Sequence, residues 1–89
     1  MLVRSRAQQG YGPQRIEAEL AAAGIPDSEI SQALAEAECD WRALAIDIHA
    51  RKFKAPPSGA AEWQKQYRFL AGRGFTADQI RAALKGEPD

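Results

Sequence analysis

The sequence predicts an all-α fold built from tandem three-helix repeats, with about five helices and part of a further helix at the N-terminus. Three observations support this prediction. Apolar residues recur at helical spacing, and no segment alternates with a period of two. Glycines and prolines fall between the periodic segments, where helices begin and end. A pattern of apolar residues and one glycine recurs at an offset of fifty residues.

The recurring pattern relates residues 20–34 to residues 70–84. The paired positions are Leu20 with Leu70, Gly24 with Gly74, Ile25 with Phe75, Ile30 with Ile80, Ala33 with Ala83, and Leu34 with Leu84. Such spacing is typical of helical arrays, in which each unit buries its apolar face against a neighbour. We therefore predict the end of a preceding repeat at 1–9, a three-helix repeat at 10–54, a Pro-rich connector at 55–59, and a second, incomplete repeat at 60–89.

The first complete helix is predicted to begin at Pro13, with Gly12 as its N-cap, because proline lacks the N–H that the first turn cannot use. Tyr11 and Ile16 have the spacing of a hydrophobic staple. Gly24 is predicted to end this helix in the left-handed conformation of a Schellman motif. The stretch from Gly10 to Pro13 has no copy near residue 60, so we expect it to serve this unit alone.

The remaining helices follow from caps and apolar stripes. Asp40 is a predicted N-cap, and Thr76 with Gln79 forms a predicted capping box. The two prolines at 56 and 57 cannot continue a helix. The predicted helices run from about Asp27 to Cys39, from Asp40 to Phe53, from Ala60 to Arg73, and from Thr76 to a stop at Gly86 and Pro88.

Charge and composition limit the classes of function. The net charge is zero, yet residues 16–40 carry seven acids and no base, and basic segments flank them. This balance favours a protein surface of mixed character over a dedicated nucleic-acid clamp. No apolar run approaches the length of a membrane span, no secretory signal is present, and the single cysteine, Cys39, fits a reducing compartment. We expect a cytoplasmic protein, and the sequence leaves its oligomeric state open.

Catalytic, metal and cofactor sites are not predicted. Cys39 has no second cysteine, so a Cys/His metal site is excluded. His49 is expected to be a surface residue or one with a satisfied hydrogen bond. The carboxylates near residues 36–40 are spread around the helix axis, which favours a solvated face. No glycine loop suited to phosphate binding occurs.

A helix-turn-helix interpretation is disfavoured, because the predicted recognition helix over 27–39 is acidic. Most aromatic residues lie on apolar stripes and are expected to be core, whereas Phe69 lies off its stripe beside Arg68. Six bases form either a solvated, helix-capping set or a cluster around the Pro-rich turn. They are Arg51, Lys52, Lys54, Lys65, Arg68 and Arg73.

Taken in order, the motifs resemble those of the RecX family of recombinase regulators over about residues 2–85. The matching stretches are GYGPQRIEAEL with AAAGI at 10–25, Asp40-Trp41, Leu44-Ala45, Arg51-Lys52-Phe53, Arg68-Phe69-Leu70 and Arg73-Gly74-Phe75. The resemblance is to the second and third repeats of that family, so we expect this chain to be a fragment that lacks a first repeat.

The resemblance implies a non-enzymatic protein that binds the RecA recombinase filament on DNA, mostly inhibits it, and modulates ATP hydrolysis and strand exchange. A helical domain that binds DNA directly is the alternative. The family motif does not fix the contact residues, so we chose them on physical grounds, as cations and one aromatic that suit an acidic protein surface or DNA phosphates. They are Arg4, Arg6, Tyr11, Arg15, Arg51, Lys52, Lys54, Arg68 and Arg73.

Overall fold

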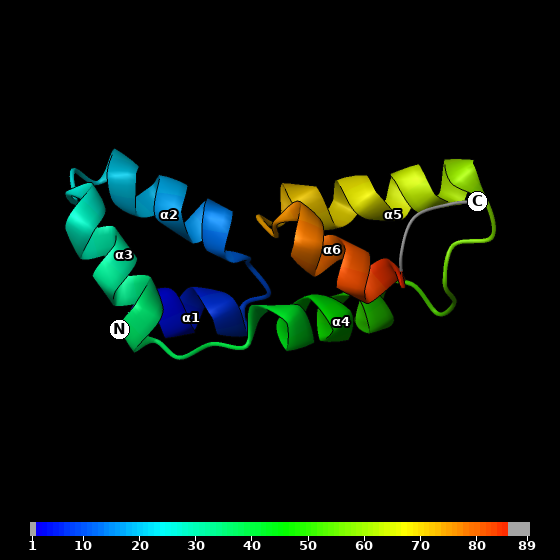
Figure 1. Cartoon of the computed structure of the whole chain (residues 1–89), viewed down its shortest axis with the longest axis horizontal. Coiled ribbons are helices and arrows are strands. Elements are labelled where there is room, and N and C mark those ends of the chain that lie inside the picture. The colour runs from blue at the N-terminus through cyan, green and yellow to red at the C-terminus, as the bar shows by residue number, and fades with distance from the viewer. Residues whose placement is uncertain (1, 86–89) are drawn as a thin grey trace.

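The computed structural model describes residues 2–85, and within this range it contains helices and no strand, which confirms the all-α prediction. The helices are α1 (Leu2–Gln8), α2 (Pro13–Ala22), α3 (Asp27–Glu36), α4 (Trp41–Lys52), α5 (Ala60–Gly72) and α6 (Ala77–Leu84). They form an elongated molecule of 41 × 18 × 16 Å, with α1–α3 at one end and α4–α6 at the other (Figure 1).

Two separate apolar clusters hold these two groups of helices together. The first contains Val3, Ile16, Ala33 and Ala37, from α1, α2, α3 and the α3 C-cap. The second draws on α4, α5 and α6, and its buried members are Ala45, Leu70, Phe75, Ile80, Ala83 and Leu84. We call residues 2–39 the first unit and residues 40–85 the second unit.

The two units group the helices differently from the repeats expected at 10–54 and 60–89. The helix that the sequence pattern assigns to the end of the earlier repeat, α4, packs along α6 of the second unit (Figure 1). The segment assigned to a preceding repeat, α1, supplies Val3 to the first cluster. Helix order along the chain is the same in both descriptions, and only the packing distinguishes them.

The predicted helix ends at the two glycines are confirmed. Gly24 and Gly74 have φ of 87° and 99°. The N–H of Ile25 donates to Leu20 O at 3.1 Å, and the N–H of Phe75 donates to Leu70 O at 3.3 Å, which are the long bonds of Schellman motifs. Gly10 ends α1 in the same way, with φ of 91° and a 3.1 Å bond from the Tyr11 N–H to Arg6 O. Sequence reasoning missed this third copy.

The predicted helix starts are also found. Gly12 is the N-cap before Pro13, and Asp40 Oδ1 accepts from the Ala43 N–H at 3.0 Å. Thr76 and Gln79 form the reciprocal capping box. The caps therefore follow local sequence rules, because each depends only on residues within one turn.

One helix end was predicted too late, and a second lies at the edge of the described residues. α3 stops at Glu36 rather than at Cys39, because Glu38 adopts a left-handed φ of 51° that a helix cannot continue through. α6 stops at Leu84, with Lys85 left-handed at φ 61°. The predicted stop at Gly86 and Pro88 lies outside the described residues. Neither Glu38 nor Lys85 carries the glycine signal that marks such a turn.

The two units meet where α2 begins and α5 ends. The N–H groups of Gly12 and Gln14 donate to Arg73 O at 2.7 Å and Gly74 O at 2.8 Å. The free donors of one helix N-terminus thus satisfy the free acceptors of another helix C-terminus, and the two helix dipoles are aligned head to tail. Gly12 and Gly74 are both buried, and a Cβ on either would collide with the other unit of the molecule. Gly12 therefore serves the junction between units rather than its own unit alone.

None of the helices within residues 2–85 is long and apolar enough to cross a lipid bilayer.

Candidate interaction surfaces

Four of the predicted contact residues meet at the junction between the two units. Three guanidinium groups surround the Tyr11 ring, with the Cζ atoms of Arg73, Arg15 and Arg6 at 4.4, 4.7 and 5.9 Å from its centroid. They come from the end of α5, from α2 and from α1. Arginine over an aromatic face is a favourable cation–π arrangement. We call Arg6, Tyr11, Arg15 and Arg73 the junction cluster.

Arg73 is largely committed to holding the junction. Its Nη2 donates to Gln9 O at 2.6 Å and its Nε donates to Gly10 O at 3.1 Å. These carbonyls lie at the C-terminal end of α1, where a cation also complements the helix dipole. Arg73 thus joins α5 to α1 across 63 residues of sequence. It lies at the C-terminal end of α5, whereas the Pro-rich turn precedes the N-terminal end of that helix.

Glu19 is the counter-ion within the junction cluster. Arg6 Nε lies 3.0 Å from Glu19 Oε1, and Arg15 Nε lies 3.7 Å from Glu19 Oε2. Arg6 also donates to Gln9 Oε1 at 2.9 Å. Glu19 pairs with two of the three arginines of the cluster, so the cluster keeps a positive charge. Arg15 has the more exposed side chain of the two arginines that share Glu19, and it is the one better placed to meet a partner.

Three further candidates, Arg51, Lys52 and Lys54, lie together at the C-terminal end of α4, remote from the junction. Lys52 Nζ lies 5.5 Å from the centroid of Phe69, and Phe53 packs edge-on against the same ring at 5.5 Å. Arg51 pairs with Asp47 at 3.1 Å in an exposed ion pair, which contributes little to stability. Phe69, which the sequence left unexplained, is therefore a half-buried ring between α4 and α5.

Arg68 extends this basic surface along α5. It is exposed, and together with Lys65 and Phe69 it has the i, i+3, i+4 spacing of one helix face. We call Lys52, Lys54, Lys65 and Arg68 the basic end of the second unit. Arg73 lies at the junction instead, and clustering of the other bases around the Pro-rich turn stays a prediction.

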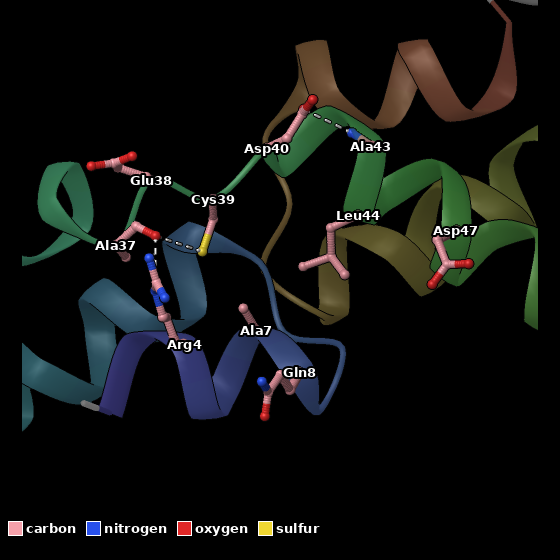
Figure 2. Close-up of a pocket in the computed structure, with 10 residues that line it drawn as sticks. All are labelled: Arg4, Ala7, Gln8, Ala37, Glu38, Cys39, Asp40, Ala43, Leu44 and Asp47. Carbon is pink, nitrogen blue, oxygen red and sulfur yellow. Dashed lines mark hydrogen bonds between the residues drawn. The ribbon is translucent and has the colours of Figure 1, made fainter.

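Arg4 lies apart from both groups. Its Nε donates to Ala37 O at 3.2 Å, which ties α1 to the C-terminal end of α3 (Figure 2). The same side chain lines a groove of about 480 Å³ between α1, the 37–40 linker and α4. Arg4 is thus part of the lining of an open groove.

The charge pattern becomes clearer when it is divided by unit. Residues 2–39 carry three bases and six acids, whereas residues 40–85 carry nine bases and four acids. Counting charges over residues 16–40 does not show this difference between the units, because the boundary between them falls inside that stretch, after residue 39. The molecule has one acidic and one basic half.

The second unit contains a buried polar pair that the sequence did not predict. His49 Nε2 and Gln66 Oε1 lie 2.6 Å apart, and the two side chains are 8% and 2% exposed. The short distance satisfies the imidazole, as expected of His49, but it places the ring in the interior between α4 and α5. Within residues 2–85, no group of three or more His, Cys, Asp or Glu side chains is arranged to hold a metal ion.

Comparison with known families fits the division into two three-helix units. A family model described as "RecX, second three-helix domain" matches residues 1–34, and one described as "RecX, third three-helix domain" matches residues 38–84. The chain belongs to the RecX family. The RecX domain boundary near residues 34–38 falls beside the linker between the two apolar clusters, so the family's domains correspond to the helices α1–α3 and α4–α6.

Several curated proteins named "Regulatory protein RecX" are similar to this chain. The protein from Halorhodospira halophila is 46% identical over 84 residues, covering 93% of this chain and 52% of the relative. The Pseudomonas putida protein is 44% identical, covering 94% and 54%. The Acidithiobacillus ferridurans protein is 40% identical, covering 94% and 88%. The chain spans about half the length of the first two relatives, and all three are named as regulators.

Proposed function

We propose that this chain acts in the cytoplasm as a non-enzymatic regulator of the RecA recombinase in DNA repair and the SOS response. It binds the RecA filament on DNA and mainly inhibits it, by modulating ATP hydrolysis and strand exchange. The observation that carries the proposal is that two consecutive RecX domain models match nearly all of the described residues.

The exposed cations are the proposed contacts to the filament. Arg15 and the bases at the end of the second unit have exposed side chains, although Arg15 also pairs with Glu19. Arg6 and Arg73 are partly buried and bond to other parts of the chain, and Arg4 is exposed but donates to Ala37 O. Exposed cations act mainly by steering association, so their effect is on the rate of binding and is sensitive to salt.

The direct test adds the chain to RecA filaments and measures DNA-dependent ATP hydrolysis and co-sedimentation. We expect co-sedimentation and reduced hydrolysis. Arg68→Glu should weaken filament binding by about 3- to 10-fold at low salt, because it reverses a steering charge. Arg42→Glu is the matched control. Arg42 is an exposed arginine of the same unit, but it lies in the first turn of α4, whereas Lys52 of the basic end is the last residue of that helix. Filaments unaffected by both this chain and a full-length relative would overturn the proposal.

Direct DNA binding is the second candidate, and the nine bases against four acids of the second unit favour it. Titration with single-stranded and duplex DNA at two salt concentrations, without recombinase, distinguishes the two. DNA binding that weakens steeply with salt, together with no gain on adding RecA, would favour this alternative.

A further inference from the structure

The C-terminal end of α2 is a copy of the helix end that joins the two units. Gly24 and Gly74 are left-handed, at φ 87° and 99°, and each lies in a Schellman motif. At the second copy, Arg73 O and Gly74 O accept hydrogen bonds from the N–H groups that begin α2. The equivalent acceptors in the first copy, fifty residues earlier, are Ala23 O and Gly24 O.

The surface that is covered at the second copy is exposed at the first. No backbone N–H within residues 2–85 donates to Ala23 O or Gly24 O. Residues 21–24, three alanines and the glycine, are all exposed, and a Cβ on Gly24 would meet nothing within 4 Å. Arg73 is half-buried and Gly74 is buried under the start of α2. The two copies therefore differ in what covers them, although their backbone geometry is the same.

The exposed copy lies at the free end of the molecule. α5 and α2 are aligned head to tail, so the C-terminal end of α2 points away from the second unit. Figure 1 shows the turn between α2 and α3 at the outer end of the first unit. In a helical array each unit contacts its neighbour through equivalent surfaces. A further unit, placed against the first as the first is placed against the second, would extend the array beyond this turn.

The family contains a domain for this position. The two matching models describe the second and third three-helix domains, so the domain that precedes them in the family's numbering is the neighbour of the first unit. The Halorhodospira halophila relative leaves about half of its length outside the match, since this chain covers 52% of it. A remainder of that size is long enough for another domain of this kind.

We propose that the α2–α3 turn at Gly24 docks a preceding three-helix domain of the kind that the longer relatives carry. Two N–H groups in the first turn of that domain's middle helix donate to Ala23 O and Gly24 O, and the two helix dipoles align. The middle helix starts at a glycine, as α2 does at Gly12, because the backbones approach too closely for a side chain. The inference goes beyond the proposed function and does not depend on it.

This contact differs from the existing junction in one respect. Ala23 stands at the position of Arg73, whose guanidinium bonds to two carbonyls at the end of α1. The docked domain is therefore held at the Gly24 turn without an arginine latch, by the backbone bonds and the close approach. A side chain added at Gly24 should consequently have a large effect on docking.

Amide hydrogen exchange measured by NMR tests the proposal. The part of the Halorhodospira halophila relative that precedes its match is joined to residue 1 of the whole chain, and this hybrid is compared with the chain alone. In the chain alone, the N–H groups of Gly24 and Ile25 should exchange faster than those of Gly74 and Phe75, because the free end of α2 frays. In the hybrid, exchange at Gly24 and Ile25 should slow by about 10-fold or more, and exchange at Gly74 and Phe75 should stay unchanged.

A matched pair of variants locates the contact. Gly24→Asn adds a side chain but keeps a residue that tolerates the left-handed conformation. It should abolish most of the slowing in the hybrid, and it should change exchange by less than about 3-fold in the chain alone. Glu38→Asn is the control, because Glu38 is exposed and left-handed at φ 51° but lies in the linker to the second unit. It should leave the slowing intact. Thermal unfolding shows whether each variant remains folded.

Four results would overturn the inference. The first is unchanged exchange at Gly24 and Ile25 in the hybrid. The second is slowing that persists in Gly24→Asn, and the third is slowing that Glu38→Asn removes equally. The fourth is slowing in the chain alone that rises with its concentration, which assigns the turn to a second copy. None of these measurements involves RecA, so failure of the proposed function would leave this inference standing, and its failure would leave the proposed function standing.

Discussion

The two copies of the repeated helix end share a backbone conformation but differ in their surroundings. Gly24 is exposed, and a Cβ placed on it would meet nothing within 4 Å. Gly74 is buried, its carbonyl accepts from Gln14, and a Cβ on it would collide with Arg15. The residues that follow differ in parallel, since Ile25 is half-buried and Phe75 is 1% exposed. One local motif thus ends a helix in the first copy and also joins two units in the second.

The largest expected difference concerns the residues after the two glycines. Phe75→Ala should lower the free energy of unfolding by about 3–5 kcal/mol, because it empties a fully buried aromatic site in the second cluster. Ile25→Ala should cost about 1–2 kcal/mol, since Ile25 buries only part of its surface. Urea denaturation of both variants measures the difference. Equal losses would show that the two copies are energetically alike.

The glycines themselves should differ by a smaller amount. Gly24→Ala is expected to destabilise by about 1 kcal/mol, the cost of a Cβ in the left-handed region. Gly74→Ala carries the same cost plus a collision with the Arg15 backbone, for a total of about 2–4 kcal/mol. Thermal unfolding followed by circular dichroism is sufficient. A melting temperature for Gly74→Ala that matches that of Gly24→Ala would mean that the junction between units yields easily.

The buried polar pair sharpens the comparison between the units. Gln66 corresponds, at the offset of fifty, to Ile16, which is fully buried in the first cluster. Gln66→Ile should destabilise by about 1–3 kcal/mol, because it removes the partner of the buried His49 ring. The double variant with His49→Leu should recover most of that loss. A double-mutant cycle by urea denaturation tests this, and additive losses would argue against coupling between the two side chains.

The smallest effect is expected where the third helix of each unit ends. Glu38 and Lys85 are left-handed there, in contrast to the glycines that end α2 and α5. Glu38→Gly and Lys85→Gly should each stabilise by about 0.5–1 kcal/mol, since glycine adopts this conformation without a steric cost. Differential scanning calorimetry can resolve the rise in melting temperature. A decrease would show that these side chains contribute contacts worth more than the backbone strain.

Much of the fold was predictable because it is local. The helix caps at Asp40 and Thr76 and the glycine stops at Gly24 and Gly74 depend on residues within a turn of each other. The left-handed turn at Glu38 was not predictable in this way, since no glycine marks it. Sequence reasoning could select cationic residues as candidate contacts, because cations are suited to acidic partners. It could not tell that Arg73 is engaged with the end of α1, as that contact spans 63 residues.

By itself, the sequence determined the helices, their ends, the fifty-residue repeat and the family, because each of these depends on residue type and spacing along the chain. Only the tertiary structure decided which helices form a unit. The apolar pattern of α4 is compatible with packing either against the helices that precede it or against those that follow it. The tertiary structure also decided that Gly12 and Gly74 meet, and that three arginines surround Tyr11. These are long-range contacts, fixed by packing and by hydrogen bonds between helix ends that no local pattern encodes.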